Sequence, residues 1–396
     1  MVEILKYLKT VGLPLVILLV FFLIDPFAKG YLAAYLLTAL IYVKKDFIQK
    51  NFDFDFVILF IFSITYALFS LLNPDIYKQT IIFYGVFPPV FFLLGKYFVV
   101  KSKKTEHLFI LLISVGFLFS FSALISVVLN LTTGGFAQYE RSIPMFWNGN
   151  EITATLMGAF FTFNMCLPAI LLTGNKKHSL LFRIASIIVF ILSLLCTFRL
   201  GSRTQIAIFI LTILISFVFI IPRLSGNKSI KLIFILFTIA ILVYMYIPSD
   251  LNSEYLSTLG KRLQESDNTG NAGGRTNRWA KSIINLFKKP LGWSVNEFGY
   301  SHNLWLDVAR INGFIPFILL LIFSLRTFLK TKTAISIDKN QLPFNNLILI
   351  FTIAANLLFF VEPITEGLFS MFLVYCFLHG VINKYVSINA KAPRTI

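Results

Sequence analysis

The chain has 396 residues, 57% of them hydrophobic and 13% charged, and its formal net charge is +17 at pH 7. A soluble domain contains about a quarter charged residues, so this composition excludes an ordinary soluble protein. Apolar runs long enough to span a bilayer recur from end to end, without the alternation typical of a membrane β-barrel. Lysines beside such spans explain the positive charge better than a nucleic-acid partner does. The sequence therefore predicts an all-α polytopic membrane protein.

Twelve apolar segments in chain order predict twelve transmembrane helices. They are residues 10–24, 28–43, 54–72, 80–100, 107–131, 152–173, 181–198, 204–221, 231–248, 303–329, 344–361 and 367–384. The first two are short, and we expect them to pack as a hairpin. The chain then divides into helices 1–9 over residues 1–248, a loop over residues 249–302, and helices 10–12 with a cytoplasmic tail over residues 303–396.

The orientation follows from the lysine and arginine residues of the short loops. If the N-terminus lies inside, most of these residues fall on the inner side, among them the clusters at 44–50 and 101–104. Cytoplasmic loops carry this excess in membrane proteins, whereas long loops are translocated whatever their charge. We therefore predict that both termini are cytoplasmic and that the loop at 249–302 is extracytoplasmic.

The first outer segment with notable polar residues is "ERSIPMFWNGNEITAT", residues 140–155. Its Asn148 and Asn150 either bind hydroxyl groups of a ligand, or Asn150 caps the helix that follows. Farther along, Cys166, Cys196 and Cys376 all lie inside apolar segments. We therefore expect no disulfide framework, no metal cluster and no cofactor.

Arg199 and Arg203 lie four residues apart on the outer side, where positive charge is otherwise scarce. If one helix continues through both, they share a face. If Gly201 breaks that helix, the turn still aims both at one spot. Two interpretations remain open: the arginines are snorkelling anchors, or they form a clamp for an anion, since the planar guanidinium binds phosphate oxygens in pairs.

The long outer loop begins with the polar, glycine-rich "LNSEYLSTLGKRLQESDNTGNAGG", whose tail we expect to be mobile. The next residues predict an amphipathic helix near 275–288, which can lie in the membrane interface. Its apolar positions at helical spacing are Trp279, Ile283, Ile284 and Phe287, and Pro290 ends it.

Arg275 and Arg278 open this predicted helix. Alone they suit a solvated face, but a helix N-terminus favours anions. Two arginine pairs on one side of the membrane make a phosphate-bearing ligand the more plausible interpretation.

The loop ends at His302, beside Asn303 and within one turn of Trp305. A histidine here is either structural or a group that exchanges a proton near neutral pH. Asp307 and Arg310 predict a surface ion pair at i,i+3, and Gly313 and Pro316 predict a bend in the span. In the last outer segment, "VEPITEG", Glu362 and Glu366 are functional candidates if the membrane buries them, and not if the loop exposes them.

Several of these motifs follow one another in a set order: "GSRTQ" at the outer start of a span, "GGRTNRW" opening the loop helix, "PLGWS" at its end, and "YSHNLWLDVARINGFIPF" opening the next span. In this order they resemble the bacterial O-antigen polymerase (Wzy-type) and O-antigen ligase superfamily. The resemblance covers about residues 199–320, and the first half of the chain resembles the family only in its spans.

The resemblance implies a metal-independent membrane glycosyltransferase of the C-type class. Its donor would be a polyprenyl-pyrophosphate-linked glycan on the outer side of the bacterial cytoplasmic membrane. The enzyme would pass the glycan to a sugar hydroxyl and release polyprenyl pyrophosphate. The family's arginines, taken to hold the pyrophosphate, match Arg203 and Arg275. Its histidine matches His302, which would take the proton of the acceptor hydroxyl or orient that hydroxyl.

Other residues are also candidates for substrate binding, and among them Arg199 and Arg278 match no residue of the family pattern. Trp293 and Trp305 offer apolar faces on which sugar rings could stack. The full set of candidates is Arg199, Arg278, Trp279, Asn303, Trp305, Trp293, Asn148, Asn150 and Glu362.

The acceptor stays open at this point. A second lipid-linked glycan makes the protein a polymerase, which we favour, and the lipid A core makes it a ligase. A flippase and a chain-length regulator are possible partners. The rival from another class is a transporter of lipid-linked glycans. Transporters keep ionisable groups near mid-membrane and have two related halves, whereas here the polar groups crowd the outer face, the long loop comes late and no repeat relates the two halves.

Overall fold

The computed structural model describes residues 2–71, 78–138, 140–173, 180–224, 253–264 and 275–390, with a few positions between 226 and 234. The first helices are α1 (Val2–Val11), α2 (Leu13–Ile24), α3 (Gly30–Tyr42), α4 (Lys45–Lys50), α5 (Phe54–Leu71), α6 (Lys78–Lys101) and α7 (Thr105–Gly134). Next come the strands β1 (Ile143–Pro144) and β2 (Glu151–Ile152), then α8 (Ala154–Ala159), α9 (Leu167–Leu171), α10 (Leu180–Leu200) and α11 (Arg203–Ile220). The last described helices are α13 (Ser257–Gln264), α14 (Arg275–Lys288), α15 (Leu304–Asn312), α16 (Phe314–Ile337), α17 (Leu342–Val361), α18 (Ile364–Gly367) and α19 (Phe369–Asn389). Short 3-10 turns cover Pro26–Ala28, Asn164–Cys166, Ile221–Arg223, Glu254–Leu256 and Val295–Glu297.

Within these described residues, eight helices are long and apolar enough to cross a membrane: α5, α6, α7, α10, α11, α16, α17 and α19. A ninth span results if α1 and α2, which meet at a 97° bend, are taken as one. The prediction of an all-α polytopic membrane protein is confirmed at this level. The predicted span at 231–248 and the loop tail at 265–274 lie almost entirely outside the described residues.

Two predicted spans differ from the structure, and one helix was not predicted. The span expected at 152–173 is broken into α8, an irregular turn and α9; Pro168 lacks the N–H needed to continue a helix, and the side chain of Asn164 bonds Ser120 and Ser193. The span expected at 303–329 is also two helices, because Gly313 separates α15 from α16 at a φ of 79°. The first part of the loop at 249–302, where the sequence predicted no element, contains α13, in which Leu259 is buried.

The predicted hairpin of the first two segments is present, because α2 packs along α3. However, α3 has thirteen residues and rises only about 20 Å, which is less than the ~30 Å hydrocarbon core. The carboxylate of Asp25 stabilises the connection by accepting a hydrogen bond from the N–H of Gly30 at 2.6 Å.

The centre of the bundle is the contact between α6 and α19. A Cβ on Gly95 of α6 would collide with the carbonyl oxygen of Phe377, and one on Gly380 of α19 would collide with that of Phe92. Glycines facing each other in this way let two helix backbones approach closely in a membrane. Within the apolar stretch of α19, 83% of the residues are buried, whereas only 22% of the residues in that of α10 are buried. Helix α19 is therefore central in the bundle and α10 is peripheral.

An ionic network inside the bundle joins α5, α16 and α19. The carboxylate of Asp55 pairs with Arg326 and accepts a hydrogen bond from Asn383 at 2.6 Å. His379 Nε2 lies 3.5 Å from the same carboxylate. Because both Asp55 and His379 are buried, the network compensates charge that would otherwise be costly in a membrane.

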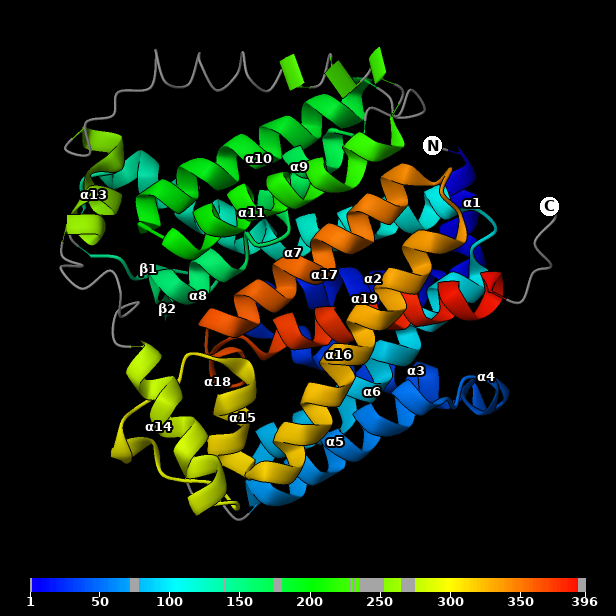
Figure 1. The fold of residues 1–396 in the computed structure, drawn as a ribbon, viewed down its shortest axis with the longest axis horizontal. Coiled ribbons are helices and arrows are strands. Elements are labelled where there is room, and N and C mark those ends of the chain that lie inside the picture. Colours follow the sequence, from blue (N-terminus) through cyan, green and yellow to red (C-terminus); the bar gives the residue numbers. More distant parts are fainter. Residues whose placement is uncertain are drawn as a thin grey trace.

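Helix α1 and the last turns of α19 lie at one end of the bundle, and α13, α14 and the β1–β2 hairpin lie at the other (Figure 1). The segments that sequence analysis places outside therefore gather at a single end.

Candidate functional site

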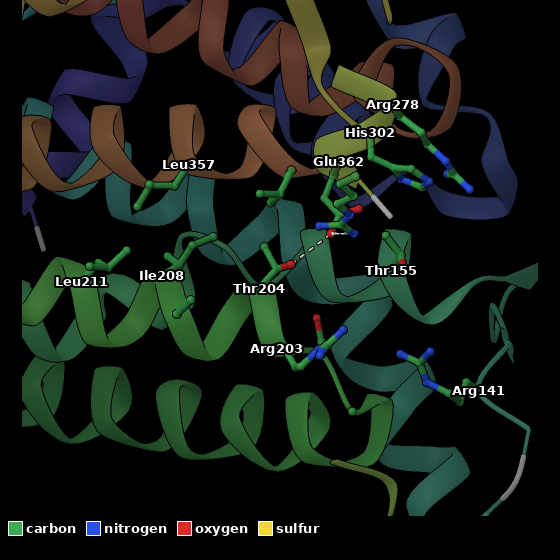
Figure 2. A pocket seen from close by; sticks show the side chains of 15 residues that line it. Arg141, Thr155, Arg203, Thr204, Ile208, Leu211, Arg278, His302, Leu357 and Glu362 are labelled. Atoms are coloured by element: carbon green, nitrogen blue, oxygen red, sulfur yellow. Dashed lines mark hydrogen bonds and ion pairs between the residues drawn. The ribbon is translucent and has the colours of Figure 1, made fainter. Parts of the chain in front are cut away.

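A cavity of about 590 Å³ opens where α11 and α14 begin and α17 ends (Figure 2). Side chains from segments far apart in the sequence line it: Arg141, Thr155, Gly201, Ser202, Arg203, Thr204, Ala207, Ile208, Leu211, Arg275, Arg278, His302, Leu357, Val361 and Glu362. Its volume falls in the usual range of small-molecule sites. Of the predicted site residues, the cavity brings together Arg203, Arg275, Arg278, His302 and Glu362.

The turn between α10 and α11 determines the position of Arg203, the first cationic residue of the cavity. Gly201 has a φ of 59°, and a Cβ there would lie 3.1 Å from the carbonyl oxygen of Thr258, so this position requires glycine. After the turn, α11 begins at Arg203, and its first residues line the cavity. The unpaired N–H groups and positive dipole end of a helix thus face the same space as the guanidinium.

Arg199 has a different place. Its guanidinium donates to Asn130 Oδ1 at 2.9 Å, to Gln138 Oε1 at 2.8 Å and to the carbonyl oxygen of Glu140 at 2.9 Å. The side chain is buried and does not line the cavity. The expectation that Arg199 and Arg203 aim at one spot is therefore wrong, because the turn at Gly201 sends them to different partners. Arg199 holds the segment after α7.

The helix predicted at 275–288 is present as α14, and Arg275 and Arg278 lie in its first turn and line the cavity. Arg278 Nη1 donates to the carbonyl oxygen of Tyr300 at 3.3 Å. Of the apolar face that the sequence predicted, Trp279 packs against Phe360, while Ile283, Ile284 and Phe287 are largely exposed. An exposed apolar stripe of this kind suits a helix lying in the membrane interface.

His302 lies in a strained turn with a φ of 53°, a region that costs a non-glycine residue about 1–3 kcal/mol. The carboxylate of Asp307 spans this turn, accepting hydrogen bonds from the N–H of Ser301 at 2.8 Å and of Asn303 at 3.1 Å. Trp279 Nε1 donates to the carbonyl oxygen of Ser301 at 2.8 Å. These bonds hold His302 in place and tie its turn to α14.

Burial, and after it the positive charges of Arg275 and Arg278, lower the pKa of His302 to about 4. The imidazole is therefore neutral at pH 7. Its Nδ1 is buried and has no hydrogen-bond partner among the described residues. A neutral imidazole in this position can orient a ligand hydroxyl, but its low pKa makes it a weak base.

Glu362 follows the last residue of α17 and is 3% exposed. Its Oε1 accepts a hydrogen bond from Thr204 Oγ1 at 3.0 Å and lies 3.6 Å from Arg275 Nη2 (Figure 2). Burial raises the pKa of Glu362 to about 7, although Arg275 and Thr204 act in the opposite direction. The glutamate thus meets the condition of burial under which the sequence made it a functional candidate.

One wall of the cavity is apolar. It consists of Ala207, Ile208 and Leu211 on α11 and Leu357 and Val361 on α17. In Figure 2 the side chains of Ile208, Leu211 and Leu357 lie to one side, away from Arg141, Arg278 and His302. The site therefore combines a cationic part, at the ends of the helices, with an apolar part between two long apolar helices.

The other predicted site residues support the structure around the cavity and do not line it. Asn303 caps α15, its Oδ1 accepting from the N–H of Leu306 at 3.1 Å. Trp305 Nε1 donates to Ser324 Oγ at 3.0 Å, and Trp293 is buried against Leu286 and Ala309. Trp293 is buried and Trp305 is partly buried, and neither ring lines the cavity, so sugar stacking on them stays a prediction.

Asn148 and Asn150 lie at the tip between β1 and β2, where Asn148 Oδ1 accepts from the N–H of Asn150 at 3.0 Å. Neither residue lines the cavity, and the residue before α8 is Thr153, so Asn150 does not cap that helix. The side chain of Asn148 thus satisfies a backbone group of the loop tip, as short polar residues often do.

The sequence predicted that Asp307 and Arg310 pair on the helix surface, but both residues are buried, so the predicted surface position is wrong. Arg310 Nε lies 3.9 Å from Asp307 Oδ1, and its Nη2 pairs with Glu366. The apparent surface of α15 is covered by other segments that sequence spacing alone does not reveal.

Arg141 and Thr204 line the cavity and were not among the predicted site residues. Arg141 donates through Nε and Nη2 to the carbonyl oxygen of Leu200 at 3.0 and 2.8 Å, which completes the end of α10. A signal was present for Arg141, since it is an arginine on the side where positive charge is scarce. Thr204 carried no such signal.

No group of three or more His, Cys, Asp or Glu side chains that could hold a metal ion occurs in the part of the chain that the structure describes. No family model matches the chain. No curated protein matches it either. We therefore infer the function from the site.

Proposed function

We propose that the protein is a glycan polymerase of the O-antigen polymerase and ligase superfamily. It transfers an oligosaccharide repeat from polyprenyl pyrophosphate to a hydroxyl of another lipid-linked repeat and releases polyprenyl pyrophosphate. The protein resides in the bacterial cytoplasmic membrane with both termini inside, and the cavity faces the extracytoplasmic side. The observation that carries the proposal is the meeting of Arg203, Arg275, Arg278 and His302 in one cavity.

The cationic part of the cavity suits a pyrophosphate. Four arginines line it, with the beginnings of α11 and α14 beside them. Guanidinium groups bind phosphate oxygens in pairs, and helix N-termini favour anions. As the glycosidic bond breaks, the leaving pyrophosphate gains negative charge. Cations fixed beside that charge stabilise the transition state, as a divalent metal does in other enzymes.

The apolar wall between α11 and α17 suits the lipid part of the same donor. Apolar residues of two membrane-crossing helices line it, and it adjoins the cationic part. A ligand with a charged head and a long apolar chain matches this combination. A free sugar phosphate has no group for the apolar wall.

His302 is the group proposed to meet the acceptor sugar. It faces the same cavity as the arginines, and the turn that carries it is held by Asp307 and Trp279. Fixed polar groups of this kind place an attacking hydroxyl near the reacting carbon, which contributes much of the catalysis of group transfer.

A transporter of lipid-linked glycans is the rival from another class. The site polar groups gather at the ends of helices instead of at mid-membrane, which favours the enzyme. A donor that crosses the membrane with its pyrophosphate link intact, in the presence of this protein alone, would establish the transporter and refute the polymerase.

The proposal is tested in a strain that lacks this gene and receives the wild-type chain, Arg203→Ala, Arg275→Ala or His302→Ala. Arg223→Ala is the matched control, because Arg223 lies at the opposite end of α11. Losing one such cation costs about 3 kcal/mol of transition-state stabilisation, or roughly 100-fold in rate. We expect each arginine variant in the cavity to remove the polymer while the protein remains in the membrane.

A gel of the surface glycans distinguishes the outcomes. A single repeat unit on its final anchor identifies a polymerase. Polymer that accumulates on the polyprenyl carrier, with the anchor bare, identifies a ligase. A normal ladder from Arg203→Ala or Arg275→Ala would remove the phosphate site from the proposal, and a normal ladder from His302→Ala would assign the histidine a structural role.

A further inference from the structure

A buried carboxyl group in a cationic cavity needs an explanation. Glu362 lines the same space as Arg141, Arg203, Arg275 and Arg278. If this space holds a pyrophosphate, a permanent negative charge beside it opposes binding. If this side chain only stabilised the fold, a glutamine could make the same hydrogen bonds without repelling the pyrophosphate. The carboxyl group therefore points to a role in which it gains or loses a proton.

The two oxygens of Glu362 have different surroundings. Thr204 Oγ1 and Arg275 Nη2 hold Oε1, at 3.0 and 3.6 Å. Oε2 is buried and has no hydrogen-bond partner in the described chain. Buried polar atoms almost always have a partner, and Glu362 lines the cavity, so a ligand group bound beside it can become the partner of this oxygen. One oxygen is thus anchored, and the other remains for a hydroxyl proton.

His302 is the other group in the cavity that titrates between acid and neutral pH, and it is the poorer base. Its pKa of about 4 reflects burial first and then the charges of Arg275 and Arg278. The pKa of Glu362, raised to about 7 by burial, lies near the working pH, where general bases are most effective. The surroundings of the two side chains therefore suit His302 to orienting the acceptor hydroxyl and Glu362 to accepting its proton.

We propose that Glu362 is the catalytic base of the glycan transfer, a role that rests on the proposed function. Its Oε2 takes the proton of the acceptor hydroxyl while the oxygen of that hydroxyl forms a bond to the anomeric carbon. The bond from that carbon to the pyrophosphate oxygen breaks, and its electron pair leaves with the pyrophosphate, whose charge the arginines face. His302 stays neutral and orients the hydroxyl.

The sign of the pH dependence follows. A base acts only when it is deprotonated, so transfer falls as the pH drops through the pKa of Glu362, near 7, and is fully active above it. The groups facing Glu362 are Arg275 and Thr204, with the other cavity arginines and His302 in the same lining. A bound pyrophosphate adds negative charge and shares Arg275, which raises the pKa further. The acid limb of kcat should therefore lie at higher pH than that of kcat/KM.

The test uses the purified full-length protein in detergent, a synthetic polyprenyl-pyrophosphate oligosaccharide as donor, and farnesyl pyrophosphate as the probe for binding. Glu362→Gln should lower kcat about 10²- to 10⁴-fold, the usual contribution of a general base. It should also flatten the acid limb, while farnesyl pyrophosphate binds within about threefold of wild type. Glu362→Asp should keep the acid limb at reduced rate.

Glu366→Gln is the matched control. Glu366 lies four residues farther on, burial also raises its pKa to about 7, and it does not line the cavity. This variant should keep both the rate and the acid limb. If the acid limb instead disappears in Glu366→Gln and persists in Glu362→Gln, the base is assigned to the wrong carboxyl group.

The remaining outcomes are separable. A Glu362→Gln protein with near-normal kcat and an intact acid limb overturns the catalytic base and leaves the proposed function standing. Loss of farnesyl pyrophosphate binding together with transfer would make Glu362 a binding or structural residue. A wild-type protein that neither binds the pyrophosphate nor transfers glycan refutes the proposed function, and the base with it.

Discussion

Replacing Asp307 by alanine should release the turn that carries His302. The carboxylate accepts hydrogen bonds from two buried backbone N–H groups, at 2.8 and 3.1 Å, on either side of the histidine. Each N–H left without an acceptor costs about 1–3 kcal/mol, so the variant loses about 2–6 kcal/mol locally. The left-handed conformation of His302 costs about 1–3 kcal/mol. In the variant, the two hydrogen bonds from Asp307 no longer offset this cost. A shift of about 2 kcal/mol changes a population roughly 30-fold.

We therefore expect Asp307→Ala to lower glycan transfer by at least about tenfold and to speed amide hydrogen exchange at Ser301 and Asn303. Exchange is measured by mass spectrometry on peptides that cover residues 295–308, and transfer on the same preparation. Asp46→Ala, on the exposed surface of α4, is the control. Normal exchange in this peptide would refute the reasoning even if transfer falls, because the effect would then not pass through the turn.

The remaining predictions concern stability, topology and metal dependence. Arg199→Ala should lower the thermal midpoint in detergent, by the equivalent of about 2–4 kcal/mol, because it leaves three acceptors without a donor; loss of transfer at unchanged stability would return Arg199 to the site. Asp55→Ala should destabilise the protein by about 3–5 kcal/mol, since it leaves Arg326 and the buried His379 without the carboxylate that pairs with them. An unchanged midpoint would show that the network contributes little. A membrane-impermeant thiol reagent should label Asn277→Cys from outside but not Ser336→Cys, and the opposite result would invert the topology. Transfer should persist in EDTA, and an EDTA loss restored by Mg²⁺ would contradict the metal-independent mechanism.

The sequence predicted a helix correctly where the structure of a segment depends mainly on its own residues. Long apolar runs lack groups that compete with the backbone for hydrogen bonds, and in a membrane such a run must be helical. The helices α5, α7, α10, α11 and α17 accordingly lie close to their predicted ranges. The same holds for α14, whose amphipathic spacing and final proline mark both its character and its end.

The prediction was wrong where a single residue interrupts a helix, or where a side chain binds a partner far away in the sequence. Residues 303–329 have the composition of one span, yet Gly313 divides them into α15 and α16. Arg199 and Arg203 belong to one motif, yet the turn at Gly201 sends one side chain into the packing and the other into the cavity. Composition over a window averages out single glycines, so it cannot register such breaks.

The sequence by itself determined a helical membrane protein with polar segments between its spans, and it indicated Arg203, Arg275 and His302 as candidate site residues. Only the tertiary structure decided that these residues share one cavity, with Glu362 among them and with Trp293 and Trp305 outside it. The physical reason is that the lining comes from segments separated by up to about two hundred residues. Their meeting depends on how whole helices pack, and no local pattern of charge or hydrophobicity encodes that arrangement.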